Sequence, residues 1–170
     1  MTDQKIRTPA DHVPSLAAVL KAEHFSTGER AALKRMAIDG AAPLALHRFM
    51  LRYIDDTWQG ESWLPEWRSL ICSLAIQRDG GFDPHKPMGR ALAEARFSEH
   101  RLERLLAAKG DTLRRLTLRA ARQLAAKGIA ADWRQVAELL FSRKPEIREA
   151  LNRRIARDFY RTIQILKREV

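Results

Sequence analysis

The chain has 170 residues, of which 45% are hydrophobic and 31% are charged. These values predict one compact domain, or two small subdomains sharing a core, and they exclude wholesale disorder. The 31 basic and 21 acidic residues give a formal net charge of +10, and 23 of the basic residues are arginine.

Helix signals dominate the first half of the chain. Ser26 and Glu29 form a capping box, in which each side chain accepts a hydrogen bond from a backbone N–H that the helix leaves unpaired. Proline suits a first helical turn because its missing N–H would have no partner there. Capping residues, prolines and glycines together predict helices over residues 26–40, 43–58 and 65–79.

Two glycines and two prolines fall within residues 80–87, which predicts a linker. We place a boundary there, between an N-terminal helical subdomain over residues 1–85 and a basic C-terminal one over residues 86–170. Strand signals are almost absent, so we expect an all-α fold of about eight or nine helices in two packed helical-bundle subdomains. The second half is expected to form helices at residues 89–95, 98–108, 112–127, 133–142 and 145–167, with Asp111 and Asp132 as caps.

The charge is divided very unequally between the two halves. Residues 1–85 carry 10 basic and 11 acidic side chains, whereas residues 86–170 carry 21 basic and 10 acidic ones. A one-sided field of this kind attracts polyanions, such as nucleic acid or an anionic membrane. The predominance of arginine favours nucleic acid, because a guanidinium group bonds two phosphate oxygens at once and also stacks on bases.

Arginines recur at helical spacing. Arg115, Arg119 and Arg122 fall within a narrow arc of one predicted helix, with no glutamate between them. Such a stripe repels itself, so phosphate binding explains it better than a merely solvated face does. We expect the arginines of the second half to form one continuous cationic track that faces outward. Similar groups occur at Arg154, Arg157, Arg161 and Arg168 in the last helix, and at Arg30, Lys34 and Arg35 in the first half.

The aromatic residues indicate what kind of binding to expect. Proteins that read single strands usually expose aromatic side chains among their cations. Here Trp58, Trp63 and Trp67 lie in the neutral half, and Trp133 directly follows a helix cap. We expect all four to make core or subunit contacts, so that the arginine surface holds backbones and does not read bases.

Patterns that would indicate an enzyme are missing. The five histidines lack metal-ligand spacing, and there is no phosphate-binding glycine loop or nucleophile elbow. Cys72 is the single cysteine, which excludes an internal disulfide and fits a cytoplasmic location. No apolar run suits a signal peptide or a membrane span. We expect no cofactor, no bound metal and no catalytic residues.

The order of features after Met88 resembles one family. MGRALAEARFSEHRLERLLAA is followed by an LxLR segment at residues 116–119 and by Asp132-Trp133 at a helix start. This order is similar to that of the small subunit of the type I-E CRISPR surveillance complex (Cascade), the CasB family. GERAALKRM at residues 28–36 is similar to that family's basic helix, and the resemblance spans roughly residues 26–141.

The resemblance implies a non-catalytic, all-α subunit that acts in antiviral defence. Two copies would stack head to tail beside the backbone and large subunits, and a positive groove would hold crRNA, target strand and displaced non-target strand. Such contacts would stabilise the R-loop without sequence preference, because strand exchange is nearly balanced in free energy. The basic positions that match the family best are Arg90, Arg96, Arg101, Arg119 and Arg122, and Arg30, Lys34 and Arg35 match more loosely.

Two other functions remain open from the sequence. A helix-turn-helix regulator is also small, helical and basic, but it needs a recognition helix with side chains that bond base edges. Residues 112–127 offer Gln123 for that role and are otherwise mostly arginine, alanine and leucine. A helical protein–protein adaptor would bind its partner with little dependence on salt and would have no affinity for nucleic acid.

Overall fold

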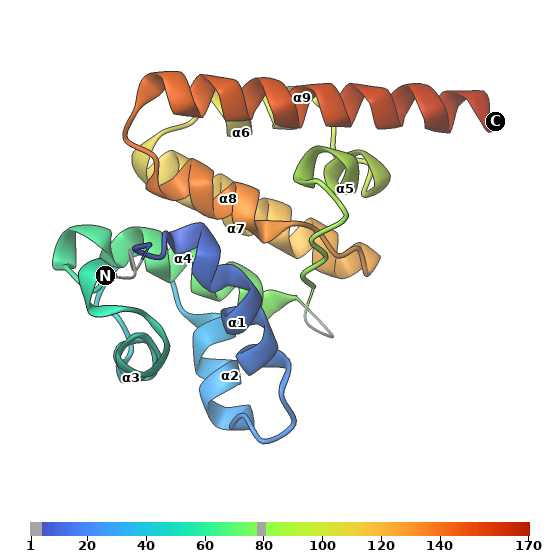
Figure 1. The fold of residues 1–170 in the computed structure, drawn as a ribbon. Helices are drawn as coiled ribbons and strands as arrows, with labels where there is room; N and C mark the ends of the chain where they lie inside the picture. Colours follow the sequence, from blue (N-terminus) through green and yellow to red (C-terminus); the bar gives the residue numbers. More distant parts are fainter. Residues whose placement is uncertain (1–4, 78–80) are drawn as a thin grey trace.

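The computed structural model describes residues 5–77 and 81–170, and within these ranges the fold is all-α, as predicted, with one isolated β-bridge (Figure 1). Nine α-helices and two short 3-10 helices follow one another in the described residues. They are α1 (Pro9–Lys21), α2 (Thr27–Arg35), α3 (Leu44–Tyr53), η1 (Asp56–Trp58), η2 (Glu61–Trp63), α4 (Leu64–Ile76), α5 (Met88–Glu94), α6 (Glu99–Ala107), α7 (Gly110–Lys127), α8 (Trp133–Phe141) and α9 (Pro145–Arg168).

Helix α4 lies at the centre of the molecule. Every residue from Trp67 to Ile76 is buried, which is typical of a helix that is surrounded on all sides. It packs against α1, α2, α7 and α8, and α1 also packs against α8. The two predicted subdomains therefore share one buried hydrophobic cluster. A boundary near residue 85 stays a prediction.

The segment predicted as a linker is tied to the connection between α7 and α8. The N–H of Asp83 donates to the carbonyl oxygen of Ala131 at 3.0 Å, and the N–H of Ala131 donates to that of Gly81 at 3.0 Å. The N–H of Asp132 also donates to the carbonyl oxygen of Lys86 at 2.8 Å. Residues 81–87 are therefore hydrogen-bonded to the rest of the fold and do not form a free linker between two subdomains. The first predicted linker residue, at position 80, lies outside the described residues.

Helix α1 has no counterpart among the predicted helices. Its start is a capping box, because the N–H of Asp11 donates to the Thr8 hydroxyl at 3.3 Å and the N–H of Thr8 donates to the Asp11 carboxylate at 2.8 Å. This is the same signature that identified Ser26 as a cap, and its spacing is visible in the sequence.

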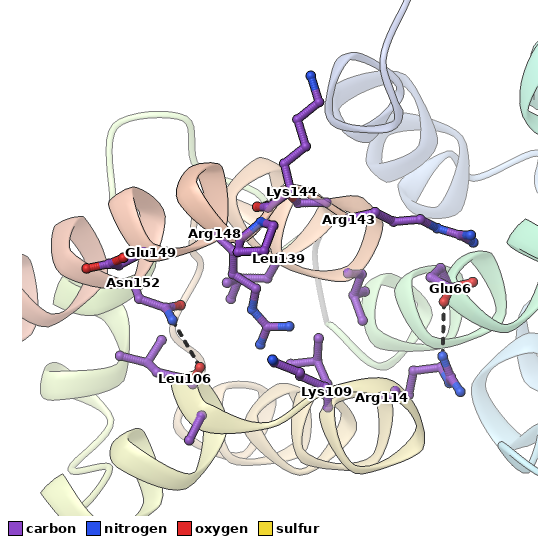
Figure 2. A pocket seen from close by; sticks show the side chains of 16 residues that line it. Glu66, Leu106, Lys109, Arg114, Leu139, Arg143, Lys144, Arg148, Glu149 and Asn152 are labelled. Carbon is purple, nitrogen blue, oxygen red and sulfur yellow. Dashed lines mark hydrogen bonds and ion pairs between the residues drawn. The ribbon is translucent and has the colours of Figure 1, made fainter.

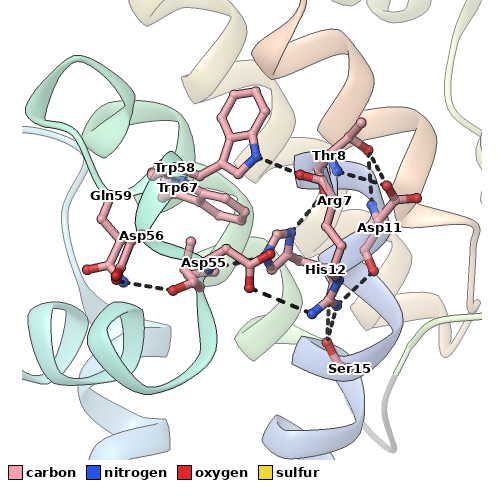
Figure 3. A network of polar contacts seen from close by, with 11 residues as sticks. Arg7, Thr8, Asp11, His12, Ser15, Asp55, Asp56, Trp58, Gln59 and Trp67 are labelled. Carbon is pink, nitrogen blue, oxygen red and sulfur yellow. Dashed lines mark hydrogen bonds and ion pairs between the residues drawn. The ribbon is translucent and has the colours of Figure 1, made fainter. Parts of the chain in front are cut away.

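A polar network joins the start of α1 to the chain after α3 (Figure 3). His12 is fully buried, and its Nδ1 donates to the carbonyl oxygen of Thr8 at 2.8 Å. In the neutral ring Nε2 is then an acceptor, and the N–H of Asp55 lies 3.3 Å from it. The Trp58 indole donates to the carbonyl oxygen of Arg7 at 2.7 Å. These side chains are used to join segments of the fold.

The three helices predicted in the first half all end earlier than predicted. α4 ends at Ile76, and residues 78 and 79 of its predicted range lie outside the described residues. α2 ends at Arg35, before the predicted stop at Gly40, because the buried Arg68 guanidinium donates to carbonyl oxygens of residues 39–41 at 2.9–3.3 Å and holds them in a loop. α3 ends at Tyr53, and the short helix η1 follows after two residues. The early end of α2 therefore arises from contacts between segments far apart in sequence.

One of the two predicted aspartate caps is confirmed. Asp132 precedes α8, and its carboxylate accepts from the N–H of Arg134 at 3.1 Å. α7, however, starts earlier than predicted, and its N-cap is Lys109, whose side chain makes no capping bond. Asp111 lies in the first turn instead and forms an ion pair with Arg114.

Helices α5 and α9 approach each other unusually closely. A Cβ atom at Gly89 would lie 2.1 Å from the carbonyl oxygen of Ile155 and 2.8 Å from the backbone nitrogen of Phe159, so only glycine allows this contact. Beyond Phe159, α9 continues past α5 at the C-terminal end of the chain (Figure 1). No residue after Phe159 is buried.

Candidate nucleic-acid interface

The corner cavity, as we call it, lies where the α6–α7 turn meets the α8–α9 turn and the start of α4 (Figure 2). It has a volume of about 460 Å³. Two carboxylates, those of Glu66 and Glu149, also line it. The basic side chains that line it come from the start of α7 and from the α8–α9 turn with the start of α9, and are Lys109, Arg114, Arg143, Lys144 and Arg148.

Two helix N-termini open onto this cavity. Lys109 is the N-cap of α7 and Lys144 is the N-cap of α9, and neither helix has a side-chain cap. The first N–H groups of a helix are unpaired and carry a partial positive charge, so they attract anions. A lysine at each N-cap adds to this field, and one carboxylate in each first turn, Asp111 in α7 and Glu146 in α9, opposes it. The arrangement suits a phosphate group.

Two carboxylates, Glu66 and Glu149, neutralise only part of the charge of the five cations that line the corner cavity. The Glu66 carboxylate accepts from Arg114 at 3.0 Å, so its charge is already matched. Arg148 has no ion pair within the described residues, and it donates one hydrogen bond to the carbonyl oxygen of Ala108. Burial lowers the pKa of the Arg148 guanidinium, because no nearby carboxylate offsets the cost of burying the charge. An incoming anion would offset that cost.

A second basic hollow, the α6–α7 groove, lies between those two helices. Its volume is about 260 Å³, and no acidic residue lines it. One Arg101 nitrogen donates to the Gln123 side-chain oxygen at 2.9 Å, and the Gln123 amide donates to the carbonyl oxygen of Ala95 at 2.9 Å. The Arg101 guanidinium is therefore held in place by Gln123, which is itself bonded to the backbone. The lining residues are Phe97, Arg101, Arg104, Leu116, Arg119 and Gln123.

The predicted arginine stripe on α7 borders the end of α2. Arg115 forms an ion pair with Asp39, in the loop after α2. Burial raises the pKa of the Cys72 thiol to about 11, and the nearby charge of Arg122 opposes this rise. Cys72 Sγ lies 3.6 Å from the carbonyl oxygen of Lys34. The stripe and the basic residues at the end of α2 therefore lie on neighbouring parts of the molecule.

Two predicted arginines are engaged by the fold. Arg30 donates to the carbonyl oxygens of Leu20 and Ala22 at 2.8 and 3.1 Å, and so closes the C-terminal end of α1. Arg90 forms an ion pair with Glu94 at 2.9 Å. In the described part of the chain, the predicted residues that are exposed and make no ion pair are Lys34, Arg35, Arg96, Arg101, Arg119, Arg122, Arg154, Arg161 and Arg168.

Arg154, in the predicted stripe on α9, faces a different hollow from the arginines of α7. Arg154 lines a cavity of about 560 Å³ beside α1 and α8, together with Glu138. Arg157 lies 3.8 Å from Asp158, its neighbour in sequence. The structure therefore does not bring the α9 stripe into the corner cavity or the α6–α7 groove. A single continuous track that includes all these arginines stays a prediction.

Sequence reasoning missed the residues of the corner cavity and Arg104. Arg104 follows Arg101 at helical spacing of three, opposite Glu99 and Glu103 on α6, and this pattern was available in the sequence. The corner cavity had no such signal. Its basic residues come from the α6–α7 and α8–α9 connections and the helix turns that follow them, which only the tertiary fold brings together.

The four tryptophans take the structural roles that the sequence predicts. Trp67 and Trp133 are fully buried, and Trp58 and Trp63 pack against the core beside Phe141.

The residues described contain no group of histidine, cysteine and carboxylate side chains that could hold a metal ion. None of the described helices has the length and apolar character that crossing a membrane requires.

Comparison with known proteins gives one match. The model of the family described as CRISPR-associated protein Cse2 matches residues 29–160. Neither a curated protein nor a solved structure matches the chain. The family match includes α2 to α8 and most of α9, and therefore the helices that form both basic hollows.

Proposed function

The chain belongs to the CRISPR-associated Cse2 family, and from this premise we propose that it binds the phosphate backbone of single-stranded nucleic acid. Membership implies the small subunit of a Cascade complex in CRISPR defence, a structural subunit that is generally non-catalytic. The observation that carries the proposal is the corner cavity, where two uncapped helix N-termini and five basic side chains meet.

The strands that we expect it to hold are those of an R-loop: crRNA, the target strand and the displaced non-target strand. The exchange of a DNA duplex for a guide–target heteroduplex is nearly balanced in free energy, so modest contacts to opened strands tip it. The partners in this proposal are the backbone and large subunits and a second copy of the chain.

The contacts in the corner cavity do not depend on base sequence. Helix N-termini and lysine side chains attract phosphate oxygens, which are the same at every nucleotide. The exposed α7 arginines, Arg119 and Arg122, extend the positive surface outside the cavity. Selection of the target is then left to base pairing with the guide.

A helix-turn-helix regulator is less well supported. Its recognition helix would need a free side chain to bond base edges. Gln123, the candidate on α7, already donates to Ala95 and accepts from Arg101. A duplex-reading role would have to disrupt both bonds.

The test removes the two exposed lysines at the helix N-termini. In the full chain, Lys109→Ala with Lys144→Ala should weaken binding to oligothymidylate and oligouridylate in fluorescence anisotropy. Affinity for single strands falls with salt with a slope of about −0.7 for each phosphate contact. Losing two contacts should therefore make the slope shallower by about 1.4.

The matched control removes the same charge elsewhere. Lys5 and Lys21 are exposed in the N-terminal part of the chain, away from the corner cavity. Lys5→Ala with Lys21→Ala should leave the salt slope unchanged. If the two double variants bind alike, or if the unaltered protein fails to bind single strands at low salt, the proposal is wrong.

A further inference from the structure

The two basic hollows differ in chemistry. The corner cavity combines two lysines at helix N-termini with three arginines, whereas the cations that line the α6–α7 groove among the described residues are all arginines. Lysine is a compact point charge that suits a phosphate, but a guanidinium group is planar and also stacks on a flat ring. The groove is therefore equipped for more than phosphate.

The floor of the groove is apolar. Phe97 is buried with 7% of its surface exposed, and Leu116 is partly buried beside it. A phosphate gains nothing from an apolar floor, because its oxygens need donors or water. A planar ring gains binding energy both from contact with the apolar floor and from stacking on the guanidinium groups that line the groove.

From these contacts we propose that the α6–α7 groove accepts a single unstacked nucleobase of a bound strand, held between Arg104 and Arg119 over Leu116. The inference rests on the proposed function and names a second feature of the ligand besides its phosphates. A volume of about 260 Å³ is below the roughly 300–1,000 Å³ of sites for drug-sized ligands, which fits one base.

The groove is organised before any ligand binds. Gln123 fixes the Arg101 guanidinium through a 2.9 Å hydrogen bond and is itself fixed to the backbone at Ala95. Ordering one arginine in advance lowers the entropy cost of binding. On α7, Arg122 lies about one turn from Arg119 and could contact a phosphate that flanks the base, whereas Arg115 is paired with Asp39.

Stacking of this kind tolerates any base, because every base has a flat π-face. The groove would therefore hold a base without reading its identity. This distinguishes it from a sequence-specific pocket, which would bond the base edge. It also means that the aromatic side chains expected of a single-strand binder are replaced here by guanidinium planes.

The experiment compares two probes with the same phosphates. The full chain is titrated with oligothymidylate and with an abasic oligonucleotide of equal length, at equal salt. Stacked bases contribute enough that oligothymidylate should bind about tenfold or more tightly than the abasic strand. Equal affinity for both probes would overturn the base site while leaving phosphate binding intact. Failure of both probes to bind would instead overturn the proposed function.

A charge-conserving variant isolates the guanidinium plane. Arg104 and Arg119 are exposed, so Arg104→Lys with Arg119→Lys keeps the charge and should not disturb the fold. This variant should lose the preference for oligothymidylate and keep its affinity for the abasic strand. Arg52→Lys with Arg153→Lys is the control, because both arginines are exposed and line neither basic hollow, and it should keep the preference. A double-lysine variant with the full preference would refute the site.

Discussion

Arg96 sits in a backbone conformation that favours glycine. It follows α5 with φ +59°, in the left-handed region. The Arg96 N–H donates to the carbonyl oxygen of Ala93 at 3.0 Å, and the Phe97 N–H donates to that of Leu92 at 2.9 Å. This pair of bonds is a Schellman motif, which usually has glycine at the position of Arg96. The arginine is therefore kept at a cost to stability.

The size of that cost can be worked out. A side chain in the left-handed region costs about 1–2 kcal/mol relative to glycine. Glycine also raises the conformational entropy of the unfolded chain, which lowers the stability of the glycine variant by about 0.4–1 kcal/mol. Arg96→Gly should therefore raise the free energy of unfolding by about 0.5–1 kcal/mol. For a chain of this length the melting temperature should rise by roughly 1–4 °C.

Arg96→Ala separates the backbone effect from the charge. It removes the same cation and retains the Cβ atom, so its stability should stay close to that of the unaltered protein. Thermal and urea unfolding measure the difference between the two variants, and anisotropy with oligothymidylate should show equally weakened binding for both. If Arg96→Gly is no more stable than Arg96→Ala, the assignment of strain is incorrect.

Gly89→Ala should destabilise the protein by about 1–3 kcal/mol in urea unfolding, since its new methyl group would lie 2.1 Å from the carbonyl oxygen of Ile155 and backbone cannot yield cheaply. An unchanged urea midpoint would show that α5 and α9 separate freely. Burial raises the pKa of Glu94, but hydrogen bonds from Lys86 and Arg90 outweigh burial and hold that pKa below the ordinary 4.5. A carboxyl group whose pKa is lower in the folded protein stabilises the fold above about pH 4.5, and this contribution is lost as the pH falls. Glu94→Gln should therefore lower the free energy of unfolding at neutral pH but not in acid. An equal loss of stability at both pH values would contradict this prediction.

Much of the fold follows from local signals along the chain. The helices after Pro145 and Asp132 begin where the sequence predicts, because a cap or a proline acts on N–H groups within one turn. α1 carries an equally local signal at Thr8 and Asp11 and was within reach of the same reasoning. The early end of α2 was not, since Arg68 holds the loop from 28 residues away in sequence.

The sequence by itself determined that this protein is helical, that its positive charge lies in the second half, and that arginines share one side of α7. Helical spacing fixes which residues share a face, and charge is a plain count. Only the tertiary structure decided which cations meet. It joins Lys109 and Lys144 at two helix N-termini, turns Arg30 toward the backbone of α1, and directs Arg154 to another hollow. The reason is that a cavity depends on how helices pack against one another. Contacts between side chains that are distant in sequence produce no local sequence pattern from which they could be predicted.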